Sequence, residues 1–232
     1  MREVDLIFPA LFWPGITIAF YMMAKRIHRR WSFWFTAPLM LAPLFVLAVA
    51  LVLHQSYGGY IRHTHWLLSL LGPATVAFAI PIWERRALIR RYWPILIAGV
   101  VVGSTTAVLS AWLFSSLFGL SRIMRLSLLP RSMSTPFAMT VSGDIGGVPD
   151  LTAIFVVLTG VFGAAIGELI LNVLPLKSVI ARGALFGAGA HGAGVAKATQ
   201  IGAEEGAVAG VVMVLVGVFN VLIAPLVAHF VR

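Results

Sequence analysis

Long apolar runs, separated by short polar segments, constrain what this chain can fold into more than any other feature. The runs cover residues 6–24, 33–53, 66–83, 93–119, 151–174 and 206–231. A helix needs about 20 consecutive apolar residues to span a bilayer. Only 11% of the 232 residues are charged and 60% are hydrophobic, which leaves too few charges for a water-facing surface. The sequence therefore predicts an all-α, polytopic transmembrane helical bundle of about seven or eight membrane segments, and not a soluble enzyme.

Two clusters of basic residues indicate how the bundle is oriented. Much of the formal net charge of +9 lies in Lys25, Arg26, Arg29, Arg30, Arg85, Arg86, Arg90 and Arg91. Each cluster stands between apolar runs, so the positive-inside rule predicts that both loops are cytoplasmic and that the N-terminus is outside. We expect a multi-pass protein of the bacterial inner (plasma) membrane, with its first run retained and no nucleic-acid partner. The sequence leaves open whether residues 120–150 cross the membrane or re-enter it.

A weak internal repeat suggests two related halves. Ala98-Gly99-Val100-Val101 recurs as Ala209-Gly210-Val211-Val212, and each copy follows an interruption, at Gly72-Pro73 and at the glycine-rich stretch 187–194. Interrupted helices at corresponding places in two halves are typical of transporter binding sites. We therefore predict one membrane domain, 1–232, with halves of about 1–119 and 120–232. The alternative is chance, because these residues are common in membrane helices.

The first candidate site comprises Arg131, Ser134, Thr135 and Pro136. Proline suits the first turn of a helix and a preceding Ser or Thr is a good N-cap, so Thr135-Pro136 predicts a helix start at membrane depth. The unpaired amides at such an end attract anions, and Arg131 would grip a carboxylate through two hydrogen bonds. The alternative is an ordinary capped helix whose nearby arginine extends to the lipid headgroups.

The second candidate site is the stretch 187–194, which has His191 at its centre. Ionisable residues within membrane spans are rare and usually functional, and histidine can carry a proton near neutral pH. His191 is therefore a candidate to contact a substrate or to titrate, and Gly189, Gly192 and Gly194 would allow close approach of the backbone. The alternative is tight helix packing with one hydrogen bond between helices.

The sequence gives little support for an enzyme. Cysteine is absent, which excludes disulfides, Cys-ligated zinc and thiol nucleophiles. Neither His-Glu-x-x-His nor Gly-x-Ser-x-Gly occurs, and His63 with His65 is a weak indication of a metal. We therefore expect no enzymatic activity, no cofactor and no metal site. Of the remaining acids, Asp144 is expected in a solvated corner, while Glu204 and Glu205 suit the N-terminus of the last helix.

Six motifs, spread over roughly residues 66–228, form a recognisable set. They are Gly72-Pro73-Ala74-Thr75-Val76-Ala77, residues 129–139, Ile145-Gly146-Gly147-Val148-Pro149, Ala181-Arg182-Gly183, His191-Gly192 and Glu205-Gly206-Ala207. Together they closely resemble the LrgB/CidB family of antiholin-like membrane proteins, which is related to the plastidal glycolate/glycerate translocator. The resemblance implies two kinds of function. Bacterial members are described as modulators of murein hydrolase activity, acting with a small holin-like partner of the LrgA/CidA type, and other relatives are linked to transport of small acids.

The two candidate sites favour transport. We expect a transporter of small monocarboxylates similar to glycolate, glycerate, lactate or pyruvate, with proton coupling left open. In this interpretation Arg131, Ser134 and Thr135 bind the carboxylate, and Gly72 with Pro73 marks the pseudo-symmetric break. The rival interpretation is an antiholin-like regulator of murein hydrolase activity and cell lysis, acting with an LrgA/CidA-type protein. The lipid bilayer is the expected surrounding in both cases, and a homo-oligomer is left open.

Overall fold

The computed structural model describes residues 2–31, 33–77 and 79–231. Throughout these residues the chain forms helices and no strand, so the predicted all-α fold is confirmed. The chain divides into two compact units, Met1–Val76 and Ala77–Arg232, and each is described by itself. These units do not correspond to the two related halves that the sequence predicts, which meet near residue 119. The division into halves stays a prediction.

The first unit is built on two helices, α1 and α2. It contains α1 (Arg2–Arg30), η1 (Trp34–Thr36), α2 (Pro38–Val52), α3 (Tyr57–Thr64), α4 (Trp66–Ser69) and most of α5 (Leu71–Ala77). Helix α1 packs on α2 through Phe20 and Phe45, whose ring centroids lie 5.5 Å apart. It also contacts α3, where Trp13 meets Tyr60 edge to face at 5.4 Å.

The apolar run 66–83 is interrupted, but not at the glycine–proline pair. It forms the short helices α4, α5 and α6 (Ala79–Glu84), and Leu70 is the C-cap of α4. Gly72 and Pro73 lie inside the first turn of α5, where a proline costs no helical hydrogen bond. The break expected at this pair is therefore displaced by about two residues toward the N-terminus.

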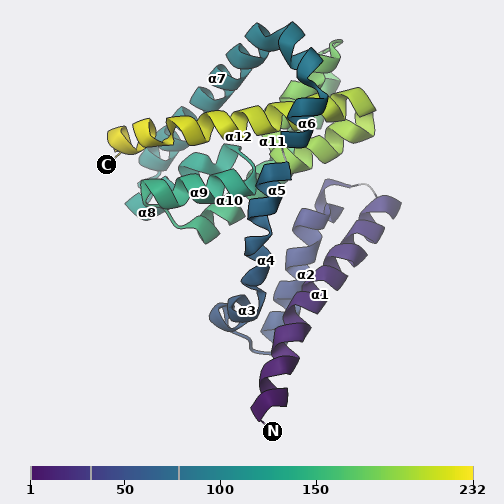
Figure 1. Cartoon of the computed structure of the whole chain (residues 1–232), viewed down its shortest axis with the longest axis vertical. Coiled ribbons are helices and arrows are strands. Elements are labelled where there is room, and N and C mark those ends of the chain that lie inside the picture. Colours follow the sequence, from purple (N-terminus) through teal and green to yellow (C-terminus); the bar gives the residue numbers. More distant parts are fainter. Residues whose placement is uncertain (1, 32, 78, 232) are drawn as a thin grey trace. The chain divides into compact units, whose positions relative to one another are not determined.

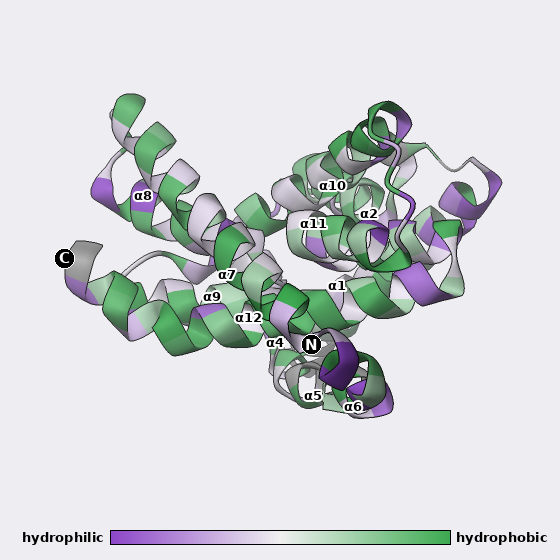
Figure 2. Cartoon of the chain, turned by 90° about the horizontal axis from the view of Figure 1, so that it is seen from above, coloured by the Kyte–Doolittle hydropathy of each residue, from purple (hydrophilic) through white to green (hydrophobic). Residues whose placement is uncertain are grey.

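The second unit holds the long helices. It consists of α6, α7 (Arg86–Leu117), α8 (Arg122–Leu128), η2 (Leu129–Ser132), α9 (Thr135–Ile145), α10 (Pro149–Val173), α11 (Val179–Ile201) and α12 (Ala203–Val231). Among the described residues α7, α10 and α12 are long and apolar enough to cross a membrane. Apolar residues dominate α7 and α12 (Figure 2). The chain is thus a membrane protein by composition, while the expected count of seven or eight segments stays a prediction.

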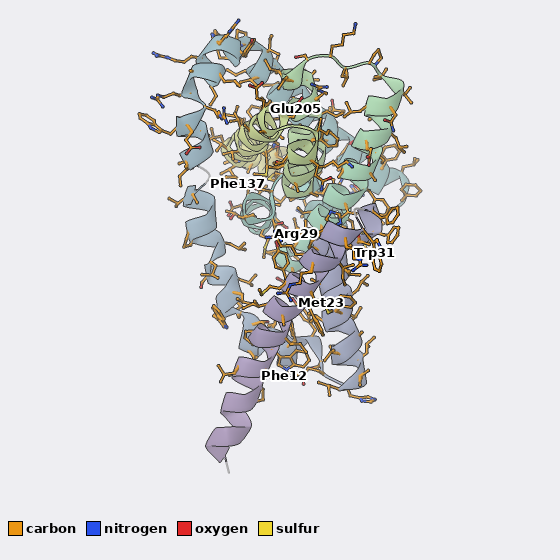
Figure 3. The ribbon with its side chains drawn as sticks, turned by 90° about the vertical axis from the view of Figure 1, so that its right-hand side faces the viewer. Phe12, Met23, Arg29, Trp31, Phe137 and Glu205 are labelled. Atoms are coloured by element: carbon orange, nitrogen blue, oxygen red, sulfur yellow. The ribbon has the colours of Figure 1, made fainter. Side chains whose placement is uncertain are left out.

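Helix α12 forms much of the core of this unit. Its residues Val208, Ala209, Val211 and Val212 are buried, and it lies beside α11 (Figure 1). Phe137 of α9, labelled in Figure 3, packs against Gly217 of α12, where any side chain would collide with its ring. Such close contacts between small and aromatic residues are how membrane helices associate, because lipid offers no hydrophobic drive between them.

A buried polar contact joins α12 to α7. Asn220 donates from Nδ2 to the hydroxyl of Ser104, 2.8 Å away, and to the carbonyl of Val216, also at 2.8 Å. Both side chains are almost fully buried, and both stand near the middle of their helices. Polar side chains in an apolar environment cost free energy unless they form hydrogen bonds with each other. This contact therefore fixes the register of α7 on α12.

Candidate functional site

Helix α11 is a hairpin of two helical arms. The arms, 179–190 and 192–201, are joined at His191, whose backbone has φ 47° and ψ −125°. Residues eight apart in a straight helix are separated by about 12 Å. A Cβ on Gly194 would nevertheless overlap the carbonyl of Phe186. The chain therefore reverses at His191 and the second arm returns along the first.

Small residues on α10 receive the first arm of this hairpin. A Cβ on Gly163 would overlap the carbonyl of Gly189, and a Cβ on Gly167 would stand 2.8 Å from the ring of Phe186. Positions later in α10 thus contact positions earlier in α11, and the two segments run antiparallel. The absence of side chains lets the backbones approach, so the glycines of α10 form the surface on which the hairpin lies.

The first arm also packs on α12, in the parallel direction. Gly183 lies against Val208, with 2.6 Å from its added Cβ to the Val208 Cβ, and Gly187 lies against the backbone of Ala209. Both contacts join residues 22 to 25 apart in sequence. This spacing arises because the second arm runs back along the first and brings the chain to the start of α12. The starts of α11 and α12 consequently lie at the same end of the unit.

Two ion pairs hold the open end of the hairpin. On the first arm, Arg182 pairs with Glu205 of α12, with 2.5 Å between Nη2 and Oε1. On the second arm, Lys197 pairs with Glu168 of α10 at 2.7 Å. Glu205, labelled in Figure 3, is buried, whereas the side chain of Glu168 is 53% exposed. The expected position of Glu205 in the first turn of the last helix is confirmed, and its main partner there is the arginine.

A second hairpin precedes α10. Its first arm consists of α8 and η2, its second arm is α9, and the turn lies at Met133 and Ser134. Both arms are tied to Thr152 of α10, whose hydroxyl lies 2.7 Å from Ser142 Oγ and 2.9 Å from the carbonyl of Ser127. The hydroxyl of Ser127 also accepts a hydrogen bond of 2.8 Å from the amide of Val148. These contacts pair residues before and after the turn, as an antiparallel hairpin requires.

The tips of the two hairpins meet. Two polar groups of the α8–α9 tip influence the imidazole of His191 electrostatically. They are the Ser132 backbone and the Arg131 guanidinium. His191 is only 1% exposed, yet neither of its ring nitrogens reaches hydrogen-bonding geometry with any described residue. The hydroxyl of Ser134 is likewise buried and without a partner. Buried polar groups are normally satisfied, so this cluster of unsatisfied groups is where a polar ligand would fit.

Helix α9 begins as the sequence predicts. Thr135 and Pro136 are its first two residues, and the N-cap is Ser134, one position before the threonine. The Ser134 side chain accepts no capping hydrogen bond from the first turn, and Thr135 and Pro136 are half-buried. The first turn of α9 therefore lacks a side-chain cap from Ser134 and lies close in sequence to Arg131, which is itself half-buried. An amide end and a guanidinium in one place form an environment for an anion.

The glycines of the second candidate site differ in their surroundings. Gly194 is buried against Phe186. Gly189 is exposed and a Cβ there would meet nothing within 4 Å, although its carbonyl lies close to Gly163. Gly192 is exposed and a Cβ there would meet nothing within 4 Å, so the close approach expected at this position is not observed. Gly72 and Pro73 are both exposed and belong to the first unit.

Sequence reasoning missed the residues that hold the tips in place. Ser127 and Thr152 stand singly in apolar stretches and match no motif, and Ser142 belongs to a glycine-rich stretch, 142–147, that was expected only to form a flexible corner. Gly160 and Gly163 are spaced three apart on α10, and this small-residue spacing was the one available signal for the surface under α11.

Comparison with known proteins places these features in a family. Residues 17–230 match the model of the LrgB-like family. The protein YwbG of Bacillus subtilis is 36% identical over 93% of this chain and 96% of its own length. The holin-like protein CidB of Staphylococcus aureus is 30% identical over 90% of this chain and 92% of its own. No solved structure matches the chain.

Proposed function

The chain belongs to the LrgB-like family, and we propose that it transports small monocarboxylates across the bacterial inner membrane as a multi-pass protein. The observation that carries this proposal is the meeting of two hairpin tips at Arg131, Ser134 and His191, where buried polar atoms lack partners. A buried unsatisfied group costs about 1–3 kcal/mol. A carboxylate that accepts from the Ser134 hydroxyl and from the one imidazole N–H of His191 would therefore be bound with a substantial gain.

The charge of the cluster favours a small anion. Arg131 is the one formal charge that acts on His191 among the described residues, and the amides at the start of α9 add partial positive charge. A carboxylate accepts hydrogen bonds from a guanidinium, a hydroxyl and an imidazole N–H, which are the groups present here. One full positive charge balances one carboxylate, so monocarboxylates fit better than dianions.

The directions of the two hairpins support transport over static binding. The open end of the α8–α9 hairpin lies at the start of α10, and that of the α11 hairpin at its end, because each adjoins α10 in sequence. The 25 residues of α10 span about 37 Å. Each hairpin arm has 10 to 12 residues and therefore reaches about half of the hydrocarbon thickness. A site between opposed tips is reached from either side when one hairpin moves, as alternating access requires.

Uptake into proteoliposomes tests this proposal. We expect saturable uptake of labelled glycolate, lactate or pyruvate by the purified full chain, measured with and without an inward proton gradient. Arg131→Ala, Ser134→Ala and His191→Ala should each lower uptake at least about tenfold, since each removes a contact worth about 1.4 kcal/mol or more. Arg62→Ala and His65→Ala are matched controls, because both side chains are exposed on the first unit.

The same experiment separates transport from the rival role. CidB is called a holin-like protein, and an antiholin-like regulator of murein hydrolase activity would act by assembly with a small holin-like partner or with copies of itself. Such a regulator has no need of an anion site. Lysis phenotypes that survive Arg131→Ala and His191→Ala, together with no uptake of any acid by well-folded protein, would reject the transport proposal in favour of regulation.

A further inference from the structure

A pocket of the second unit is lined by none of the residues of the two hairpin tips. It has a volume of about 370 Å³ and is lined by the starts of three helices, α7, α11 and α12. At its rim stand Arg85, Ser178 and Glu204, all of which are exposed. Ser178 is the N-cap of α11, and its hydroxyl already accepts a hydrogen bond from the amide of Ala181. The rim thus presents one cation and one anion that are not paired with each other.

Below the rim the pocket is apolar. Leu88, Val179 and Ala207 form half-buried walls, and the buried Val208 forms the floor. A pocket with charges at its mouth and hydrocarbon beneath matches a molecule that is itself charged at one end and apolar at the other. Phospholipids have this form, and they are the solvent around a membrane protein.

The residues beside the pocket are those of a membrane interface. Helix α7 is kinked at Tyr92, which lines the pocket, with φ −116° and ψ 15°. The arm before the kink carries exposed arginines, and the guanidinium of Arg86 lies 4.7 Å from the ring centroid of the exposed Trp83. Tryptophan, tyrosine and arginine gather at the headgroup level of bilayers. The mouth of the pocket therefore stands at headgroup depth.

We infer that this pocket binds a phospholipid with a zwitterionic primary-amine headgroup, phosphatidylethanolamine. The phosphate meets the guanidinium of Arg85, and the ammonium donates hydrogen bonds to the carboxylate of Glu204. The upper part of an acyl chain lies along Leu88, Val179 and Ala207. A choline headgroup offers the same charges but no N–H donor, and a glycerol headgroup offers no cation, so the carboxylate at the rim distinguishes the three lipids.

The test measures lipid binding to the purified full chain by native mass spectrometry and by thermal denaturation in detergent. Phosphatidylethanolamine, phosphatidylcholine and phosphatidylglycerol of identical acyl chains are added separately. Phosphatidylethanolamine should bind about tenfold more tightly than phosphatidylcholine, as one charge-assisted hydrogen bond provides. Glu204→Gln should remove this difference, and Arg85→Gln should weaken binding of both lipids, while Arg90→Gln, outside the pocket lining, should change neither.

Two results with the parent protein would overturn the inference. One is equal binding of the amine and choline lipids by the parent protein, and the other is tighter binding of phosphatidylglycerol, which would mean that net positive charge alone attracts lipid. Ala207→Phe fills the apolar wall without touching either rim charge. It should abolish the preference for phosphatidylethanolamine even if a rim variant proves unstable, and a preference that survives this change also contradicts the pocket. Uptake of monocarboxylates is a separate readout, so the two proposals fail independently.

Discussion

Gly194 lies against the carbonyl oxygen of Phe186, although eight residues separate the two along α11. The contact exists only because the chain reverses at His191, and no side chain fits between the two arms at this level. Replacing Gly194 by alanine should force the arms apart and destabilise the protein by about 1–3 kcal/mol, the range for overpacking. The melting temperature of the purified protein measures this.

Gly210→Ala provides the matched control for that substitution. Gly210 is also a helical glycine, but a Cβ there would meet nothing within 4 Å, so alanine should be neutral or slightly stabilising. Equal losses at both positions would mean that glycine acts through helix propensity in general, and not through the hairpin contact.

The backbone of His191 leads to a second prediction. Its φ of 47° with ψ of −125° lies in a region that glycine adopts freely and other residues adopt at a cost of about 1–3 kcal/mol. His191→Gly should therefore leave the protein more stable than His191→Ala, by about 1 kcal/mol, although glycine removes more atoms. Chemical denaturation of the two variants compares them directly. Both should be inactive in uptake, which separates the strain from the function of the ring.

The two ion pairs at the base of α11 should differ in strength. Glu205 is buried and Arg182 is partly so, whereas Glu168 is mostly exposed. Glu205→Ala leaves a partly buried guanidinium without its carboxylate and should cost about 2 kcal/mol, below the full range for a buried pair. Glu168→Ala should cost less than about 1 kcal/mol, as exposed pairs do. Thermal denaturation at low and high salt measures both, and salt should reduce only the smaller effect.

The buried contact between Asn220 and Ser104 allows a quantitative test. A double-mutant cycle with Asn220→Ala and Ser104→Ala should give a coupling energy of about 0.6 kcal/mol, and not more than about 1.7 kcal/mol. The free energy of unfolding in mixed micelles supplies the four values. A coupling energy of zero would show that the 2.8 Å contact does not join α12 to α7 in the membrane environment.

The sequence predicted those features that depend on local chemistry. Helix α9 begins at Thr135 because proline and a preceding hydroxyl residue determine a helix start within a few positions. The glycine-rich stretch likewise predicted an interruption in α11, and the structure has it at His191. Long apolar runs predicted long helices for the same reason, since helix formation in a membrane follows from hydropathy along one segment.

The reversal at His191 was beyond such reasoning. Glycines flank this position at 189 and 192, and any of them would have been a more natural place for a positive φ. The choice of a histidine depends on packing between arms that are joined only after the chain has turned. The ties of Thr152 to Ser127 and Ser142 are equally non-local, because a lone hydroxyl in an apolar helix does not reveal its partner.

A hairpin that enters and leaves the membrane on the same side adds no crossing. The two hairpins therefore determine whether the second unit crosses the membrane an even or an odd number of times. With α8–α9 and α11 both returning, only α7, α10 and α12 change sides, and three is odd. The proposed arrangement then places the basic start of α7 and the end of α12 in opposite compartments, and it places the starts of α7, α11 and α12 in the same one. Arg85, Ser178 and Glu204 line a single pocket, as that count requires. The positive-inside rule, which predicts a cytoplasmic position for the arginines at the start of α7, then predicts the same side for Lys177 and Arg182.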